Sequence, residues 1–245
     1  MDEIAGTWGW ISVLKSTYVS VVRFARKVAE RCGLLAALER SNNRFALWIR
    51  SLFGIYDSAD LVRLDMPWWT FSAIDAVNSF LASRNHKARV YEFGAGASTV
   101  WLAKRSGSVD SVEHDAPFAQ TMGGIFGAYP NIAVRVVEPV AASASSKARS
   151  NRKGYTQCSF DQYVSSIDRV DGTFDLIVID GRARVSCLAK SVSRLSPGGM
   201  ILFDNSNRPE YRQAINSCGL QERVTRGLAP ALPFPSQTSI LTQRA

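Results

Sequence analysis

The sequence is poor in cysteine, and its cysteines are not spaced for metal binding. The 245 residues contain four, Cys32, Cys158, Cys187 and Cys218, and no two of them form a C-x-x-C pair. This spacing argues against a zinc site, and a chain of this length does not need a disulfide framework. The pattern favours a reducing, cytoplasmic environment.

The sequence also lacks internal repeats, low-complexity tracts and any long apolar run. Residues 4–24 are rich in apolar and aromatic types, but Lys15 and several Ser and Thr interrupt them. The segment therefore falls short of the roughly 20 apolar residues that span a bilayer. It also has no convincing signal-peptide cleavage site. We expect an amphipathic helix here, within a chain that forms one large α/β domain with a short extension.

Positive charge is concentrated near the start of the chain. The formal net charge is +8, and the first fifth of the chain contains Lys15, Arg23, Arg26, Lys27, Arg31, Arg40, Arg44 and Arg50. These side chains either form a solvated helix face or contact a negatively charged partner. Among such partners we expect the anionic inner face of a membrane, and we do not expect nucleic acid. The sequence does not indicate an oligomeric state.

Two regions follow from the spacing of apolar residues. From Ile11 to about Phe53 they recur at helical intervals with Gly33 as a break, which predicts two helices covering one side of the main domain. We therefore divide the chain into a helical extension, residues 1–65, and a main domain, residues 66–245. A further helix is expected from Trp68, after the turn at residues 65–67.

From residue 89 the pattern alternates between strands and helices. Strands are expected at residues 89–93, 109–113, 132–137, 174–180 and 200–204. Helices are expected at residues 99–105, 117–127, 160–167 and 183–195. This alternation predicts a Rossmann-like, doubly wound α/β sheet that is mostly parallel. Residues 220–224 and 239–242 add an antiparallel C-terminal hairpin, which brings the sheet to seven strands. Residues 141–153, basic and without an acid, are expected to form a mobile loop or a substrate lid.

The first of these strands runs directly into glycines. From residue 90 the sequence reads V-Y-E-F-G-A-G-A-S-T, and the second strand ends about twenty residues later in Glu113. Glycines at this point leave backbone N–H groups free at a helix start, and a carboxylate at the end of the next strand can hold ribose hydroxyls. The spacing predicts a nucleotide pocket.

The glycines distinguish between two kinds of nucleotide. A dinucleotide site needs G-x-G-x-x-G, but Thr99 stands at the third position. S-adenosylmethionine has no phosphate, and its amino group favours an acid beside the glycines, which Glu92 supplies. A nicotinamide-dependent oxidoreductase is therefore the weaker alternative.

These motifs resemble those of the class I S-adenosylmethionine-dependent methyltransferases. The segments Y-E-F-G-A-G-A-S-T, S-V-E-H-D at 111–115, V-I-D-G-R-A-R at 178–184, G-L-A-P at 227–230 and T-S-I at 238–240 are similar, more narrowly, to the plant glucuronoxylan 4-O-methyltransferase type and its bacterial relatives. The resemblance begins at about Trp68 and leaves the first sixty residues unexplained.

The resemblance implies roles for individual residues toward the cofactor. The backbone at Gly94 and Gly96 would pass under the methionine part, and Glu113 would hold the ribose diol with both carboxylate oxygens. The other implied cofactor residues are Glu92, Ser98 and Thr99 around the glycines, His114 or Asp115 beside the adenine, and Asp180 at the end of a neighbouring strand.

The acceptor side rests on two aspartates at strand ends. Asp180, Asp204 and Asn205 offer oxygen ligands for a divalent cation such as Mg²⁺. They are similar in type to the metal site of the catechol and caffeoyl-coenzyme A O-methyltransferases, although the lysine of the catechol type is replaced here. Without a metal, Asp180 would act as general base, and Arg182 with Arg184 would bind a carboxylate or phosphate of the acceptor.

Together these observations predict an S-adenosylmethionine-dependent O-methyltransferase with Asp180, Arg182 and Asp204 as catalytic residues. Its expected acceptor is a hydroxyl of a glycan, glycolipid or related small molecule, and its expected location is the cytoplasm, at the inner face of a membrane. The alternatives are a metal-dependent O-methyltransferase of small phenolics and a non-catalytic adaptor that uses the nucleotide fold as a scaffold.

Overall fold

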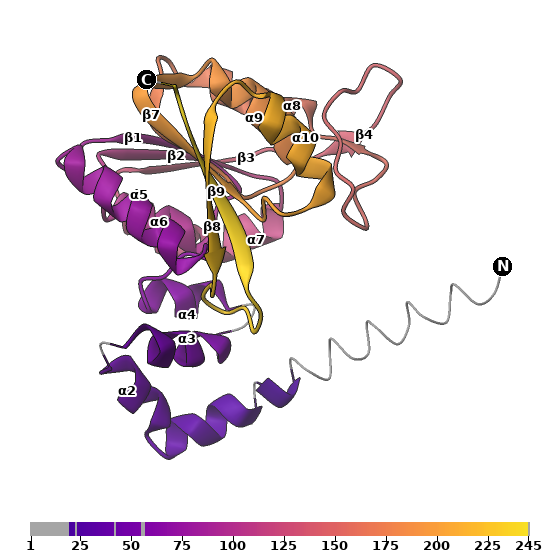
Figure 1. Cartoon of the computed structure of the whole chain (residues 1–245). Helices are drawn as coiled ribbons and strands as arrows, with labels where there is room; N and C mark the ends of the chain where they lie inside the picture. The colour runs from indigo at the N-terminus through magenta and orange to yellow at the C-terminus, as the bar shows by residue number, and fades with distance from the viewer. Residues whose placement is uncertain (1–19, 23, 42, 55–56, 245) are drawn as a thin grey trace.

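The computed structural model describes residues 20–22, 24–41, 43–54 and 57–244. Most of the amphipathic helix predicted at residues 4–24 lies outside the described residues. At the centre stands a seven-stranded sheet of order β3-β2-β1-β6-β7-β9-β8, in which β9 alone runs antiparallel to its neighbours (Figure 1). Its strands are β1 (Arg89–Phe93), β2 (Ser108–Glu113), β3 (Ile132–Val136), β6 (Phe174–Ile179), β7 (Leu195–Asp204), β8 (Gln221–Gly227) and β9 (Ser236–Thr242). The predicted doubly wound sheet with a C-terminal hairpin is confirmed.

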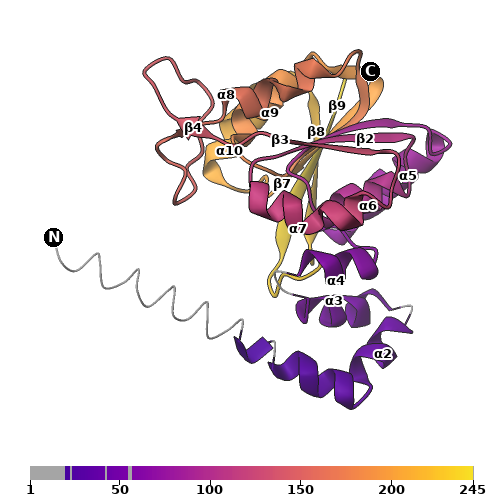
Figure 2. The same cartoon turned by 180° about the vertical axis from the view of Figure 1, so that it is seen from behind.

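Six helices cover the two faces of the sheet, as the opposite views of Figures 1 and 2 show. One face carries α5 (Phe71–Ser83), α6 (Ala97–Ala103) and α7 (Ala116–Phe126). The other carries α8 (Asp161–Ser165), α9 (Arg184–Val192) and α10 (Pro209–Ser217), with a 3₁₀ turn (Ser166–Arg169) after α8. The burial of both faces explains why the central strands are apolar at consecutive positions.

The side chains of β1 alternate between these two layers. Tyr91 and Phe93 pack with Ile177 in the core under α8 and α9, whereas Val90 packs with Trp101 in the core under α5 and α6. Glu92 points to the same side as Val90, and it is the one carboxylate of β1 and is completely buried. A polar group at this depth needs partners from the protein.

Several element boundaries differ from the predicted ones. The helix expected at 99–105 begins at Ala97, the helix expected at 183–195 ends at Val192, and β7 already begins at Leu195. Leu195 pairs with Phe174 across a shift in register, and Gly198 in the intervening bulge has a φ of 70°. A bulge of this kind is not visible as a periodic pattern, because it interrupts the alternation of side chains.

The segment predicted as a mobile loop is anchored at its base. β4 (Val140–Ala141) and β5 (Cys158–Ser159) pair as an antiparallel ribbon. Within the segment, the backbone N–H groups of Lys147 and Ala148 donate to the carboxylate of Asp161. Ala148 is buried as a result.

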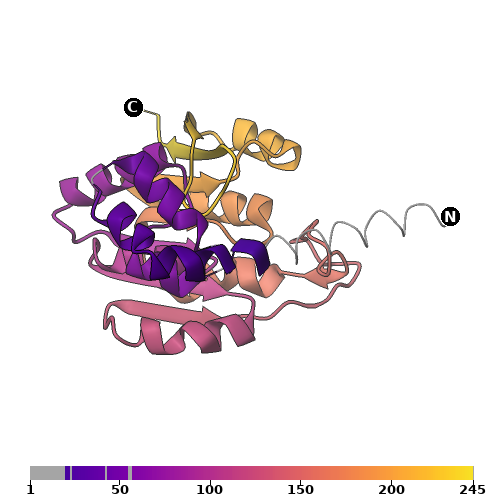
Figure 3. The ribbon, with the colours of Figure 1, turned by 90° about the horizontal axis from the view of Figure 1, so that it is seen from below.

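The N-terminal helices lie at one end of the sheet, next to the loop that joins β8 to β9 (Figures 1 and 3). They comprise the helical residues 20–22 and 24–31 and the helices α2 (Leu34–Glu39), α3 (Arg44–Leu52) and α4 (Ser58–Arg63). Gly33 has a φ of 74° and breaks the helix where the sequence predicts. Trp48 Nε1 donates to the carbonyl of Leu232 at 2.9 Å, which ties α3 to that loop. No helix in the described part of the chain is long and apolar enough to cross a membrane.

Candidate functional site

The predicted site residues meet at the carboxyl ends of β1, β2, β6 and β7. The chain moves outward from β1 to β2 and β3 and then returns to β6 on the other side of β1. The strand order therefore reverses between β1 and β6, which is where ligands bind in open α/β sheets. Gly94 follows β1, Glu113 ends β2, Asp180 follows β6 and Asp204 ends β7.

A network of hydroxyl groups around Glu92 holds the glycine loop. Glu92 accepts hydrogen bonds from Ser98 Oγ at 2.5 Å, Thr99 Oγ1 at 2.6 Å and Ser111 Oγ at 2.7 Å. Thr99 Oγ1 in turn accepts from the N–H of Gly96 at 2.8 Å. Burial raises the pKa of Glu92 to about 7, against the opposing effect of these hydroxyls.

This network changes the role expected for Glu92. The side chain is completely buried, so its carboxylate does not reach the crevice beside the glycines. It fixes the first turn of α6 from below through Ser98 and Thr99. Ser111 was missed by the sequence analysis, because β2 reads S-V-D-S-V-E and Ser111 is only one of several polar residues in it.

The two glycines of the loop have different surroundings. Gly94 has a φ of 103°, and a Cβ there would lie 2.7 Å from the Cα of Gly181, so the loops after β1 and β6 touch backbone to backbone. Gly96 is extended, with a φ of 178°. A Cβ on Gly96 would meet no protein atom within 4 Å. The space above Gly96 is therefore open to a ligand.

Glu113 has one oxygen engaged and one available. Its Oε1 accepts the backbone N–H groups of His114 and Asp115, both at 2.8 Å. Among the described residues nothing donates to Oε2. The sequence predicts that both carboxylate oxygens hold a ribose. Only Oε2 is available for that role, because Oε1 accepts the backbone N–H groups of the turn after β2. Asp115 caps α7 by accepting from the N–H of Phe118.

His114 is buried beside Glu113 without satisfying its ring nitrogens. Both nitrogens lack a hydrogen-bond partner in the described part of the chain, although Nδ1 lies 2.6 Å from Glu113 Oε1. The ring contacts the edges of Tyr155, Phe160 and Tyr163. A buried polar group without a partner costs stability unless a ligand or water satisfies it.

Arg184 lies between the two aspartates of the acceptor side. Its Nη2 donates to Asp180 Oδ1 at 2.8 Å, and its Nη1 lies 3.7 Å from Asp204 Oδ2. Asp204 is buried and accepts from Thr238 Oγ1 at 2.9 Å. Burial and the neighbouring Asp180 raise the pKa of Asp204 to about 7, and Arg184 opposes this shift.

The predicted metal site does not fit this arrangement. A guanidinium already supplies the positive charge between Asp180 and Asp204, and Asn205 Oδ1 accepts from Arg208 at 2.8 Å. Within the described residues no group of three or more His, Cys, Asp or Glu side chains is placed to hold a metal ion. The predicted pairing of Arg182 with Arg184 as one fork also fails, because Arg184 is buried and Arg182 is not paired with it.

Arg182 is the arginine that faces the crevice without an acid. Its guanidinium lies 5.6 Å from the ring centre of Tyr155, and its Nε is buried without a hydrogen-bond partner in the described part of the chain. Burial, with Arg152 and Arg184 nearby, lowers the pKa of Arg182. Sequence analysis missed the aromatic side chains of this region, Tyr155 and Tyr163, because nothing in their local pattern distinguishes them from core residues.

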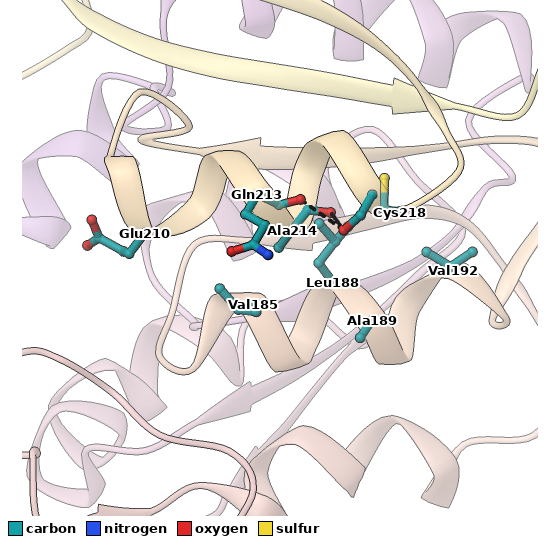
Figure 4. A pocket seen from close by; sticks show the side chains of 9 residues that line it. Val185, Leu188, Ala189, Val192, Glu210, Gln213, Ala214 and Cys218 are labelled. Carbon is teal, nitrogen blue, oxygen red and sulfur yellow. Dashed lines mark hydrogen bonds between the residues drawn. The ribbon is translucent and has the colours of Figure 1, made fainter.

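Two surface hollows lie away from these residues. One, of about 530 Å³, runs between α9 and α10, where Val185, Leu188 and Ala189 face Gln213 and Ala214 (Figure 4). The other lies between α7 and the edge strand β3. Neither contains a predicted site residue, and the candidate site is placed at the strand ends by the reversal of strand order between β1 and β6.

Comparisons with known proteins found structural likeness only. No family profile and no curated protein matches the chain. Among solved structures, a methyltransferase-like protein from Silicibacter pomeroyi is 22% identical, with a TM-score of 0.46 and coverage of 69% of this chain and 87% of that chain. The N-methyltransferase NodS from Bradyrhizobium japonicum is 11% identical (TM-score 0.47, coverage 69% and 94%). An rRNA methylase from Streptococcus thermophilus is 14% identical, with a TM-score of 0.47 and coverage of 70% of this chain and 96% of that chain. These identities are too low for the activities of those proteins to be transferred to this chain.

Proposed function

We propose that the protein is an S-adenosylmethionine-dependent O-methyltransferase. The observation that carries the proposal is the pairing of an open glycine with a carboxylate that has one oxygen available. Among the described residues, none apart from the chain neighbours of Gly96 lies within 4 Å of a Cβ placed on it at the end of β1, and none donates to Glu113 Oε2 at the end of β2. These two strands are adjacent and parallel. A ligand that lays an amino-acid part over the glycine and a ribose against the carboxylate satisfies both.

The described residues fit this cofactor without a phosphate site. Gly96 allows close approach of the ligand to the backbone, Gly94 shapes the loop beneath it, and Ser98 and Thr99 fix the helix start through Glu92. His114 offers a buried ring nitrogen to the adenine side. When bound, S-adenosylmethionine supplies an electrophilic methyl group on a sulfonium.

Asp180 is the proposed proton acceptor. Its side chain is 21% exposed, and Arg184 engages only Oδ1. Oδ2 receives no hydrogen bond from the described residues and takes the proton of the acceptor hydroxyl. The acceptor oxygen forms the new bond to the methyl carbon, the carbon–sulfur bond breaks, and its electron pair stays on sulfur. Asp204, buried behind Arg184, supports this arrangement from β7.

The proposed acceptor is a hydroxyl of a glycan, glycolipid or related small molecule that carries a negative charge. Arg182 is the reason for expecting a negatively charged acceptor. Its guanidinium has no carboxylate partner among the described residues, and it lies near Arg152. A carboxylate or phosphate matches its planar donors. The sugar part follows from the sequence resemblance. A labelled-methyl assay on fractionated glycans, lipids and phenols tests it, and we expect label in a carbohydrate-containing fraction.

Calorimetry with S-adenosylhomocysteine tests the proposed cofactor. We expect the unaltered chain to bind it and Glu113→Gln to bind at least about tenfold more weakly, because the amide places a donor against ribose hydroxyls. Glu210→Gln, at an exposed position of α10, is the matched control and should bind normally. Absence of heat with the unaltered chain would refute the proposal and favour the adaptor alternative.

The N-terminal helices form the proposed contact with an anionic membrane. Val21, Phe24 and Val28 are exposed at helical spacing, and Lys27 and Arg31 are exposed beside them. An apolar stripe flanked by basic side chains favours the interface of anionic lipid. Co-sedimentation with phosphatidylglycerol vesicles, compared with phosphatidylcholine vesicles, tests this contact. Phe24→Ser should weaken the binding, and equal binding to both lipids would argue against it.

A further inference from the structure

Arg184 joins the ends of two neighbouring strands. It is the first residue of α9, and its side chain is 6% exposed. Nε donates to the carbonyl of Gly181 at 3.1 Å, Nη2 to the carbonyl of Asp180 at 2.8 Å, and Nη1 to the carbonyl of Asp204 at 2.5 Å. One guanidinium therefore holds the backbone of residues 180–181, directly after β6, against the last residue of β7.

The same guanidinium balances two carboxylates that lie close together. Asp180 Oδ1 accepts from Arg184, and Asp204 Oδ2 lies 3.7 Å from Nη1. The guanidinium also lies 5.9 Å from the ring centre of Tyr211 on α10, which closes its far side. A buried carboxylate, Asp204, and a half-buried one, Asp180, are stabilised by a positive charge between them, because each negative charge raises the energy of the other.

We propose that Arg184 is a built-in cation that takes the place of a divalent metal between Asp180 and Asp204. It is a positioning residue: it holds Asp180 by one oxygen and leaves the other facing the crevice. The link to proton removal rests on the methyltransferase function proposed above, whereas the replacement of a metal by a side chain rests on the contacts of Arg184 alone.

An arginine suits this place for two physical reasons. Its guanidinium stays protonated at every pH the protein meets, and its donors have a fixed planar geometry that can serve carbonyls and carboxylates together. A divalent cation, by contrast, would also need ligand oxygens that here accept from protein donors. The acceptor hydroxyl is then oriented by the protein and not by coordination to a metal.

The test follows the carboxyl carbon of Asp204 by NMR in the full-length chain labelled with ¹³C-aspartate. Removal of the neighbouring cation in Arg184→Gln should raise the titration midpoint of Asp204 by about one pH unit or more. Arg184→Lys keeps the charge and should stay within about half a unit of the unaltered chain. Thermal unfolding of both variants reports the loss of hydrogen bonds, which a purely structural role would also produce.

The second measurement is calorimetric titration of the unaltered chain with millimolar Mg²⁺, which requires no variant to fold. We expect no binding that depends on Asp180. Mg²⁺ binding that disappears in Asp180→Asn, or an unchanged Asp204 midpoint in Arg184→Gln, would overturn the proposal. Binding of S-adenosylhomocysteine is measured in parallel. Absence of S-adenosylhomocysteine binding would refute the methyltransferase function. It would leave the Asp204 titration and the Mg²⁺ titration, which test Arg184, unchanged.

Discussion

Two glycines separated by one residue meet different requirements in this protein. Gly94 is required by the protein itself, because its φ is 103° and a Cβ would strike the backbone of Gly181. Gly96 is extended and faces open space, so nothing in the protein requires a glycine there. The remaining reason for a glycine at position 96 is a ligand that lies against the backbone.

Alanine substitutions should separate these two requirements. Gly96→Ala should keep the melting temperature of the unaltered chain, because its Cβ meets no protein atom, yet weaken S-adenosylhomocysteine binding at least about tenfold by occupying the ligand's space. Gly94→Ala should lower the free energy of unfolding by about 2 kcal/mol or more, from strain and the clash with Gly181. Thermal unfolding and calorimetry measure both effects. Normal ligand binding by Gly96→Ala would contradict the proposed site.

The sequence predicts which residues gather at the strand ends better than it predicts what each one contacts. The glycines are recognisable because they end the apolar run of a strand. The acids are recognisable because they follow such runs directly. Arg182 and Arg184 are only two positions apart, and both read as solvent-facing or ligand-binding. Only the packing of α9 decides that Arg184 turns inward to the aspartates and Arg182 turns to Tyr155.

At the level of elements, a buried ion pair joins α3 to α4. Arg50 donates to both oxygens of Asp60, at 2.9 and 2.8 Å, and both side chains are 1% exposed. Glu39 and Arg63 extend the pair toward the surface. Because neither charge can reach water, each depends on the other.

Breaking this pair should destabilise the protein far more than breaking an exposed one. Asp60→Asn removes the carboxylate that binds two nitrogens of the buried Arg50 and leaves Glu39 as the remaining acid beside it, and we expect the free energy of unfolding to fall by about 3 kcal/mol. Arg44→Gln removes the exposed pair with Asp75 and should cost less than about 1 kcal/mol. Denaturant unfolding compares the two variants. Equal losses would mean that the helices of the extension do not unfold together with the sheet.

The elements themselves were predictable where their pattern is periodic. The central strands are short apolar runs bounded by turn residues, and β1 spans the predicted residues 89–93. The anchored loop was not predictable, because it depends on hydrogen bonds from Lys147 and Ala148 to one carboxylate, Asp161. The early start of α6 likewise depends on hydroxyls bound to a buried acid, Glu92, which periodicity does not record.

For the whole molecule, two buried carboxylates make stability fall as the pH rises toward neutrality. Burial raises the pKa of both Glu92 and Asp204 to about 7. Between the ordinary carboxyl range and pH 7 the folded protein therefore binds more protons than the unfolded chain. The stabilisation is complete at low pH and is lost as the pH rises toward 7, at up to about 3 kcal/mol for Glu92 and about 4 kcal/mol for Asp204.

The unfolding free energy should consequently fall between pH 5 and pH 8, and Glu92→Gln should show roughly half of that fall, since Asp204 still titrates. Urea unfolding at several pH values measures the slope. Glu210→Gln, at an exposed position, should keep the full slope. A slope that Glu92→Gln leaves unchanged would show that this side chain is already ionised in the folded protein.

The backbone contact between Gly94 and Gly181 has one consequence for how such a protein could change its chemistry. The segment assigned to the methyl donor and the segment assigned to the proton acceptor meet as two main chains, with no side chain between them whose replacement could widen or narrow the gap. The distance between the two segments is therefore set by the spacing of the strands in the sheet. In the proposed reaction, new acceptors would have to be accommodated farther out, at positions such as Arg182, while the distance between the two segments stays constant.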